Sequence, residues 1–339
     1  MLVVLKSEAT PQQTEAVCAE IRAMGFTPHP MPGAGRTAIG ITGNNGPVNP
    51  LPLEALAGVD QCIPVTKGYK LVLREMKPEG TVVKVKGTEI GGGRNFTIIA
   101  GPCSVESTQQ MADVARFLKD QGVHLIRGGA FKPRTSPYSF QGLEQKGLDI
   151  LREIGGTFGL GTVTKVMDTS MVEEVAAAAD VLQIGARNMQ NYSLLKRVGK
   201  VARPVFLKRG MSATLEELLL AAEYILHGGN YGVILCERGV RTFADHSRNT
   251  LDLSIVPSVQ KISHLPIFAD PSHAIGKRTF IEPMAKAALA CGADGLMVEV
   301  SPDPDHALSD GAQTMDFKSF ERLLASLRPL AQALGRTIN

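Results

Sequence analysis

The sequence predicts a closed (β/α)8 barrel preceded by a small α+β domain. Three observations support this fold class. Eight short apolar segments recur after residue 96, amphipathic helical patterns separate them, and together they span close to the ~250 residues typical of such barrels. A doubly wound open sheet is the alternative, but no GxGxxG motif follows a first strand, which counts against a dinucleotide-binding domain.

Residues 1–67 are expected to form a β-α-β-β-α-β unit, the order of a ferredoxin-like domain. The strand LVVLK precedes a helix in which Thr10 is the expected N-cap, Pro11 the first helical residue and Gly25 the stop. The segments FTPHP and RTAIGITG are expected strands, LPLEALAG a short helix and VDQCIPVTK the last strand. Such domains often sense ligands, although the pattern alone does not establish a ligand.

Residues 68–95 are interpreted as a linker with a short hairpin, because TVVKVKGTEI alternates between apolar and polar residues. The run GGGR at 91–94 lacks the GxxxxGK[ST] pattern, so it is interpreted as a turn rather than a phosphate loop. Residues 96–339 are the predicted barrel. Its expected strands are FTIIA, VHLIRG, GTVTKV, VLQIGA, PVFLKR, YGVILCE, LPIFAD and ADGLMVEV.

The composition is that of a globular enzyme, with 44% hydrophobic and 20% charged residues among 339. The net charge of +3 and the absence of Trp argue against nucleic acid as a partner. The start MLVVLKSEAT predicts no secretory signal, and no apolar run approaches the ~20 residues that span a bilayer. Five scattered cysteines without a CxxC pair predict reduced thiols and a cytoplasmic location.

A basic loop, RGGAFKPRTS, holds Arg127, Lys132 and Arg134 and no carboxylate. In a (β/α)8 barrel the chemistry lies at the carboxyl ends of the strands. Polar or charged residues follow every predicted strand, and this recurrence favours a site for phosphate and carboxylate groups over a solvated surface patch. The residues are Cys103, Arg127, Lys132, Lys165, Arg187, Lys208, Arg209, Glu237, Arg238, Asp270, His273, Glu299 and Asp310.

Cys103, His273, Glu299 and Asp310 stand out against this basic background. They follow the first, seventh and eighth strands, which are neighbours in a closed barrel. One thiolate, one imidazole and two carboxylates make a candidate site for Mn²⁺, Fe²⁺, Co²⁺ or Zn²⁺. Taken singly, a cysteine such as Cys103 is more often a small buried residue than a ligand, and a histidine such as His273 is more often a hydrogen-bonded loop residue.

Seven motifs closely resemble those of 3-deoxy-D-arabino-heptulosonate 7-phosphate (DAHP) synthase, in the subgroup with an N-terminal ferredoxin-like domain. They are AGPCSVES, RGGAFKPRTSPYSFQG, IGARNMQN, LKRG, ILCERGVRTF, DPSHAIGKR and VEVSPDPDHALSDGAQ. The resemblance runs from residue 1 to the C-terminus and is strongest over 97–312. It implies a transferase that condenses phosphoenolpyruvate with erythrose 4-phosphate, the first step of the shikimate pathway of aromatic amino acid biosynthesis.

The resemblance also implies roles for individual residues. It makes Cys103, His273, Glu299 and Asp310 the ligands of a divalent metal ion (Mn, Fe, Co or Zn). The residues expected to hold phosphoenolpyruvate are Arg127, Lys132, Arg187, Lys208 and Arg238. The residues expected at the phosphate of erythrose 4-phosphate are Arg134, Thr135 and Ser136. Asp270 is expected beside the aldose, and Lys132 is expected to act as an acid. The catalytic set is thus Lys132, Cys103, His273 and Asp270.

One position departs from the family pattern. Where family members usually have Glu at the end of the third strand, this chain has Lys165 in the segment VTK. An added cation could hold an anion more tightly, could misplace the attacking water, or could pair with Glu237. Activity is still expected, because the candidate metal ligands and the KPRTS loop are intact.

Three other functions remain open from the sequence. The first is 3-deoxy-manno-octulosonate 8-phosphate synthase, which uses arabinose 5-phosphate; KPRTS and the N-terminal domain favour the four-carbon aldose instead. The second is a Schiff-base aldolase that uses Lys165 or Lys208. The third is a non-catalytic paralogue that binds phosphorylated metabolites. The resemblance further implies an aromatic amino acid as an effector of the small domain, and a homo-oligomer of two or four chains.

Overall fold

A computed structural model describes the chain from residue 1 to 339, except residues 45, 66–67, 133–135 and 137. The chain forms two compact units. The first comprises residues 1–81 and 260–265, and the second comprises 82–259 and 266–339. The predicted linker, 68–95, is divided between the two units, and the domain limits at 67 and 95 expected from the sequence stay a prediction.

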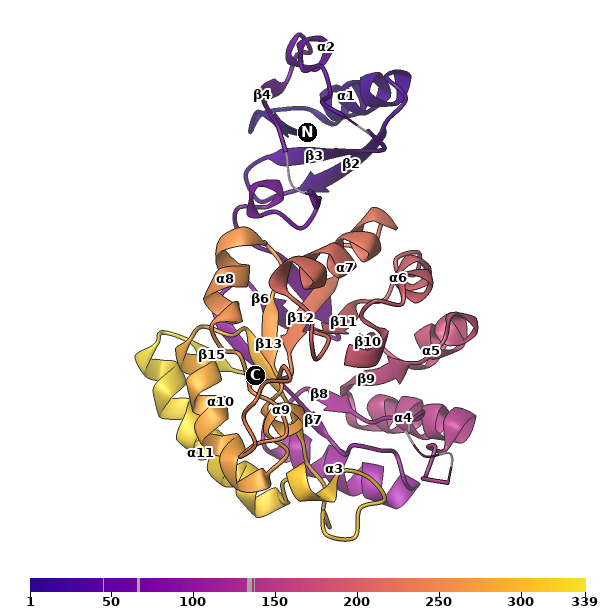
Figure 1. The fold of residues 1–339 in the computed structure, drawn as a ribbon, viewed down its shortest axis with the longest axis vertical. Helices are drawn as coiled ribbons and strands as arrows, with labels where there is room; N and C mark the ends of the chain where they lie inside the picture. Colours follow the sequence, from indigo (N-terminus) through magenta and orange to yellow (C-terminus); the bar gives the residue numbers. More distant parts are fainter. Residues whose placement is uncertain (45, 66–67, 133–135, 137) are drawn as a thin grey trace. The chain divides into compact units, whose positions relative to one another are not determined.

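The first unit is an antiparallel sheet with the strand order β2-β3-β1-β4 (Figure 1, indigo to violet). Its elements are β1 (Leu2–Leu5), α1 (Pro11–Ala23), β2 (Thr27–Pro32), β3 (Thr37–Thr42), α2 (Leu51–Glu54), β4 (Val59–Ile63) and the 3₁₀ turn η1 (Arg74–Met76). Thr10 caps α1 in a capping box with Gln13, and Gly25 follows the helix with a φ of 81°. The element order and the cap confirm the sequence-based prediction.

Residues 71–81 and 260–265 are joined by buried hydrogen bonds within the first unit. The ring of His264 is hydrogen-bonded through Nδ1 to the Thr81 hydroxyl (2.7 Å) and through Nε2 to the Leu71 carbonyl (2.7 Å). The backbone N–H of Thr81 donates to the His264 carbonyl at 2.7 Å. The first unit therefore includes a short segment from far along the sequence.

The second unit is a closed parallel barrel. Its strands are β7 (Asn95–Gly101), β8 (Leu125–Arg127), β9 (Gly161–Val166), β10 (Val181–Ile184), β11 (Val205–Lys208), β12 (Val233–Glu237), β13 (Ile267–Ala269) and β14 (Gly295–Glu299). Each strand pairs with the next, and β14 closes on β7 with Glu299 opposite Gly101. The strands coincide with the eight predicted apolar segments, so the (β/α)8 prediction is confirmed.

Helices cover the outside of the barrel strands (Figure 1). They are α3 (Thr108–Asp120), α4 (Glu144–Phe158), α5 (Val172–Ala178), α6 (Tyr192–Val198), α7 (Leu215–His227), α8 (Ile255–Ile262), α10 (Ile281–Ala290) and α11 (Phe317–Ala333). The short helix α9 (Pro271–Ile275) instead follows the carboxyl end of β13 directly and carries His273. The short 3₁₀ turns are η2 (Thr169–Met171), η3 (Ala186–Asn188), η4 (Arg278–Phe280) and η5 (Gly311–Gln313). Among the described residues, no helix has the length and apolar character needed to cross a membrane.

A hairpin of β5 (Val82–Val85) and β6 (Thr88–Gly91) packs against the inside of the barrel. Its inward residues, Val83, Val85 and Ile90, share one buried cluster with side chains of the barrel strands. At the same end, β15 (Thr337–Ile338) pairs with the start of β7. These elements occupy the amino-terminal end of the strands, which leaves the carboxyl end for the site.

Candidate active site

The closure of the barrel brings together residues from its first and last strands, which are far apart in the sequence. Cys103 lies two residues beyond β7, and Glu299 is the last residue of β14, the strand paired with β7. Gly101 is required at this junction, because its φ is 145° and a Cβ there would lie 2.2 Å from the Arg127 carbonyl oxygen. The strands therefore approach closely where the site begins.

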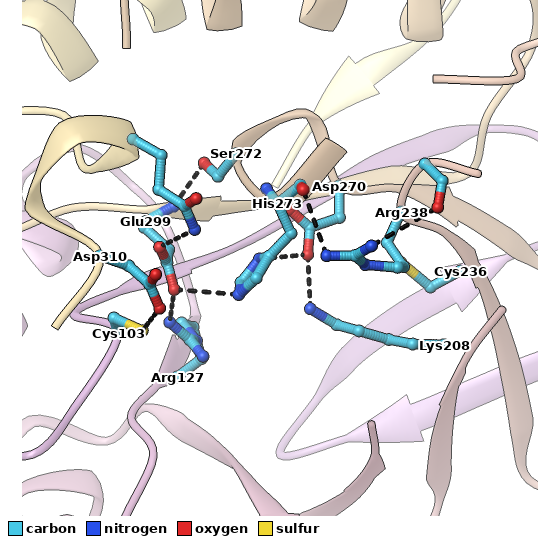
Figure 2. Close-up of polar contacts among 12 residues, drawn as sticks. Cys103, Arg127, Lys208, Cys236, Arg238, Asp270, Ser272, His273, Glu299 and Asp310 are labelled. Atoms are coloured by element: carbon cyan, nitrogen blue, oxygen red, sulfur yellow. Dashed lines mark hydrogen bonds and ion pairs between the residues drawn. The ribbon is translucent and has the colours of Figure 1, made fainter. Parts of the chain in front are cut away.

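Four side chains converge at this position (Figure 2). One ligand atom from each of Cys103, His273, Glu299 and Asp310 lies within 4.8 Å of all the others. The Cys103 thiol donates to Asp310 Oδ2 at 3.0 Å, and His273 Nε2 lies 3.3 Å from Glu299 Oε1. Ligands held at about 2.0–2.3 Å from one metal ion lie at most about 4.6 Å apart. The spacing of the cluster is close to this limit, and a set of one sulfur, one nitrogen and two carboxylate oxygens suits a divalent first-row ion.

Neighbouring side chains fix the orientation of two of these groups (Figure 2). Glu299 Oε1 accepts from Arg127 Nη1 at 2.7 Å, and Glu299 Oε2 accepts from Gln313 Nε2 at 2.7 Å. Asp270 lies 2.8 Å from His273 Nδ1 and also accepts from the His273 backbone N–H. A carboxylate on Nδ1 leaves Nε2 to face the cluster, which is the arrangement that metal-binding histidines use.

The charges of the cluster follow from burial and from these neighbours. Burial alone would raise the pKa of Glu299. The nearby charges of His273 and Arg127 lower it by more than burial raises it, so the pKa falls to about 2. Asp270 behaves in the same way, since His273 and Lys208 outweigh burial and hold its pKa well below the ordinary value. Burial, with Glu299 nearby, raises the pKa of the Cys103 thiol to about 11. Both carboxylates are thus ionised at neutral pH, whereas Cys103 is a thiol in the absence of a cation.

A pocket of about 390 Å³ opens beside the cluster, and its wall includes His273 and Asp310. Most of its charged residues are cationic. They are Lys132, Lys165, Arg187, Lys208, Arg238 and Arg248. Such a pocket suits a small ligand with several negative charges, because guanidinium groups bind phosphate and carboxylate in a bidentate way and ammonium groups supply compact charge.

Several of these cations are oriented by bonds to the candidate metal ligands or to Asp270, which contacts His273. Lys132 Nζ donates to the Cys103 carbonyl at 2.9 Å and lies 2.7 Å from its sulfur. Lys208 forms an ion pair with Asp270, and Arg238 donates to the His273 carbonyl at 3.2 Å. The pocket and the ligand cluster therefore form one continuous site.

The structure brings most of the predicted site residues together, with two qualifications. Arg127 is buried against Glu299 and the Pro102 carbonyl and is not in the pocket wall. Ser136 is exposed and lies outside the pocket wall. Arg134 and Thr135 lie outside the described residues. The roles predicted for all the site residues stay predictions at this point.

The suggested pairing of Lys165 with Glu237 is wrong. Glu237 accepts instead from Arg209 Nη1 at 2.9 Å and from the Gly239 backbone N–H at 2.6 Å. Arg209, at the end of β11, bridges Glu237 to Asp252 and thereby holds the β12–α8 loop rather than the pocket. The Asp252 backbone N–H also donates to Glu237 at 3.4 Å, so all three of these partners lie outside the pocket wall.

Gln313 and Arg248, which contact the candidate metal ligands, were not predicted from the sequence. Gln313 orients Glu299, and Arg248 Nη1 donates to Gln313 Oε1 at 2.9 Å while it lies 3.6 Å from Asp310 Oδ1. Gln313 follows Asp310 by three residues within the motif SDGAQ, which could have indicated it. Arg248 belongs to a loop without such a signal.

The fold and this site together define a class of protein. It is a (β/α)8-barrel enzyme that handles small anions at the carboxyl ends of its strands, beside a cluster of candidate metal ligands. Comparison with known proteins then places the chain in a family. Residues 75–335 match the DAHP synthetase I family, and residues 1–67 match the DAHP synthase ferredoxin-like domain. The chain therefore belongs to the DAHP synthetase I family.

Individual relatives agree with this assignment. Phospho-2-dehydro-3-deoxyheptonate aldolase of Thermotoga maritima is 48% identical over 339 residues, which is 100% of both chains. Its crystal structure superposes with a TM-score of 0.80 and covers 100% of this chain and 99% of that one. A 2-dehydro-3-deoxyphosphooctonate aldolase of Nitrobacter hamburgensis is 34% identical and covers 73% of this chain and 91% of its own length. A truncated form of the Thermotoga synthase covers 80% of this chain with a TM-score of 0.75.

Proposed function

We propose that this chain condenses phosphoenolpyruvate with D-erythrose 4-phosphate and water to give 3-deoxy-D-arabino-heptulosonate 7-phosphate and phosphate. The reaction is the first step of the shikimate pathway. The observation that carries the proposal is the cationic pocket whose wall includes two members of the candidate metal cluster. Two phosphorylated substrates repel one another in water, so a site that joins them must supply compensating positive charge.

The pocket cations support the proposed binding of phosphoenolpyruvate. Lys132, Arg187, Lys208 and Arg238 line the pocket and offer charge to its phosphate and carboxylate groups. Arg127 acts differently, because its bond to Glu299 places it behind the pocket wall, where it adds positive charge without lining the pocket. The phosphate of erythrose 4-phosphate is assigned to Arg134, Thr135 and Ser136, on the loop that follows Lys132.

Cys103, His273, Glu299 and Asp310 would hold the divalent ion, which is Mn²⁺, Fe²⁺, Co²⁺ or Zn²⁺. The ion would supply Lewis-acid polarisation of the aldehyde oxygen of erythrose 4-phosphate. The protein's own residues orient the reactants: C3 of phosphoenolpyruvate bonds to the aldehyde carbon, water adds at C2, and phosphate leaves. Asp270 contacts His273 and the Lys208 ammonium, which supports its proposed role beside the aldose.

Lys132 is the proposed acid for proton transfer to the oxygen of the reacting aldehyde. Its ammonium contacts the carbonyl and the sulfur of Cys103, so it lies at the border between the ligand cluster and the pocket. Lys132→Met is expected to reduce turnover by at least about a hundredfold, the scale of general acid catalysis. Normal turnover in this variant would exclude the role.

One experiment tests the function and the metal together. The full chain is stripped of metal and assayed for phosphate release with erythrose 4-phosphate and, separately, with arabinose 5-phosphate. Mn²⁺, Fe²⁺, Co²⁺ and Zn²⁺ are then restored one at a time. We expect no turnover without metal and restored turnover with erythrose 4-phosphate. Preference for the five-carbon aldose would contradict the proposal, as would borohydride trapping of a substrate on Lys165 or Lys208.

We also propose that the ferredoxin-like unit binds an aromatic amino acid that inhibits the barrel, and that the chain assembles as a dimer or tetramer. The match of residues 1–67 to the DAHP synthase ferredoxin-like domain supports the first idea. The unit contributes none of the described ligand or pocket residues, so catalysis alone does not explain it. Size measurement of the purified chain tests the second idea.

A further inference from the structure

Lys165 lies in the wall of the candidate substrate pocket, at the end of β9. It is paired in register with Gln183 on β10, and both residues line the pocket. A Cβ on Gly185 would lie 3.5 Å from Lys165 Cε, so the side chain extends along the glycine. This distance is an ordinary van der Waals contact, so the backbone at Gly185 lies directly beside the Lys165 side chain.

Lys165 differs from the neighbouring pocket cations in its partners. Lys132 and Lys208 each have a protein acceptor, and Arg238 donates to backbone carbonyls. Within the part of the chain that the structure describes, Lys165 has no hydrogen bond and no ion pair. A partly buried cation without an acceptor destabilises the folded protein, because it has lost part of its hydration and no protein group replaces those hydrogen bonds.

The charges around Lys165 add to this cost. In the described residues, the groups that face it are Lys132 and Arg127 from β8 and its loop, Cys103 from the β7 loop, Lys208 from β11 and Arg187 beyond β10. All but Cys103 are cations. Burial first, and then Lys132, lower the pKa of Lys165 to about 7, with smaller contributions from Lys208 and Arg127. The free protein thus holds an amine that is only partly protonated at neutral pH.

We propose that Lys165 binds phosphoenolpyruvate directly through its ammonium group and takes up a proton when this anion binds. The inference rests on the proposed function, since it assumes that phosphoenolpyruvate occupies this pocket. The bound anion supplies the acceptor and the negative charge that the protein does not provide. It therefore favours the protonated amine, and the proton comes from solvent.

This coupling makes affinity depend on pH in a defined direction. Below the free-protein pKa of about 7 the amine is already charged, and binding takes up no proton at this residue. Above it, binding must draw a proton from solvent, so the affinity contributed by Lys165 falls as pH rises. The chain would thus hold its substrate more tightly at neutral than at alkaline pH.

The test measures heat and proton uptake when phosphoenolpyruvate binds to the full chain loaded with Mn²⁺. Titration calorimetry at about pH 8, in buffers with different heats of protonation, gives the number of protons taken up. Wild type is compared with Lys165→Met, with Lys165→Arg, whose guanidinium stays charged, and with Lys318→Met as a control at an exposed site on α11.

We expect wild type and Lys318→Met to take up more protons than Lys165→Met, by a difference approaching one. Lys165→Met is expected to bind about tenfold or more weakly at neutral pH, the scale of one hydrogen bond to a charged group. Lys165→Arg is expected to keep most of the affinity and to lose the extra proton uptake. Unfolding is excluded if all variants retain their melting transition.

Two outcomes overturn the inference. Lys165→Met that binds as tightly as wild type with the same proton uptake would show that Lys165 does not contact the ligand. Tighter binding by Lys165→Met would show that the ammonium repels it. By contrast, if wild type itself fails to bind phosphoenolpyruvate, the proposed function fails, and this result is distinct from a failure confined to Lys165.

Discussion

At the scale of single residues, the site is organised around Glu299, a fully buried carboxylate that remains ionised. Burial would protonate it, but His273 and Arg127 reverse the effect, and its pKa is about 2. Glu299 is therefore already in the charged form that a cation binds. The less obvious contributors are residues that hold Glu299 in place, and Gln313 is the clearest example.

Gln313→Leu is expected to weaken metal binding about 10- to 100-fold, because Glu299 Oε2 loses its amide donor and the carboxylate can rotate. Equilibrium titration of metal-stripped protein with Mn²⁺ measures the change directly. Gln332→Leu, at an exposed position on α11, is the matched control and should bind metal as wild type does. Equal affinity in the two variants would exclude a positioning role for Gln313.

Lys165 also affects the stability of the substrate-free protein. Its pKa is about 7 in the folded chain and has an ordinary value of 10.5 when unfolded, so the unfolded state binds more protons between these pH values. The folded protein therefore gains stability from this residue as pH rises through that window, and the cost of the buried charge is complete below about pH 7. Removal of the amine should relieve that cost.

Lys165→Met is accordingly expected to melt at least about 2 °C higher than wild type near pH 6, a shift on the scale of 1 kcal/mol for a large domain. The advantage should shrink as the pH approaches 10. Melting curves of the substrate-free protein across this range provide the measurement, with Lys318→Met as reference. A variant less stable than wild type at every pH would contradict the account.

The ligand cluster could be predicted from sequence, whereas the partners of its residues could not. Cys103 and Glu299 lie at the ends of the first and last barrel strands, and closure of any (β/α)8 barrel makes those strands neighbours. In contrast, whether Glu237 meets Lys165 or Arg209 depends on side-chain directions that periodicity does not specify. The backbone of the loop that carries Arg248 is equally unspecified by local pattern.

At the scale of elements, the β5–β6 hairpin has a larger role than a linker. The sequence predicted its alternation, but not that one face fills the amino-terminal end of the barrel with Val83, Val85 and Ile90. This placement could not be derived, since alternation indicates which residues share a face and does not indicate what covers that face. The hairpin therefore completes the core of the unit that carries the site.

Two adjacent valines of β5 provide a matched test. Val83 is 4% exposed and Val82 is 39% exposed. Val83→Ala is expected to destabilise the barrel by about 2 kcal/mol, because it leaves a cavity in the core. Val82→Ala should cost much less. Denaturant unfolding followed by circular dichroism measures both, and equal effects would mean that the hairpin does not contribute to the barrel core.

At the scale of the whole molecule, residues 68–81 belong with a segment that lies almost two hundred residues further on. His264 is buried and depends on Thr81 and Leu71 for both of its ring hydrogen bonds. A chain that begins at residue 82 leaves these ring nitrogens unpaired, whereas a chain that begins at residue 68 keeps both partners. The two truncations separate the ferredoxin-like sheet from the segment that follows it.

The chain 68–339 is expected to fold with its barrel intact, and the chain 82–339 to be less stable by about 1–3 kcal/mol, the cost of an unsatisfied buried polar group. Thermal melting of the two proteins checks this order. His264→Leu in the full chain provides a third comparison, because it removes the polar ring and keeps an apolar side chain. If 82–339 is as stable as 68–339, the buried hydrogen bonds of His264 contribute nothing.

The same truncation at residue 68 tests regulation. The ferredoxin-like sheet has its own core of residues such as Val3, Val17 and Ile39, and among the described residues it adds none to the candidate site. An effector that binds this unit can change activity only through a difference in its affinity for two states of the chain. That coupling must vanish when the unit is removed, whatever its pathway.

We therefore expect tyrosine or phenylalanine to inhibit the full chain, with a change in substrate affinity in the usual range of about 5- to 150-fold, and to leave 68–339 unaffected. Turnover without effector should survive the truncation, because the ligand cluster and the pocket are retained. Rates of phosphate release with and without each amino acid provide the measurement. Undiminished inhibition of 68–339 would place the effector site on the barrel itself and refute a regulatory role for the small unit.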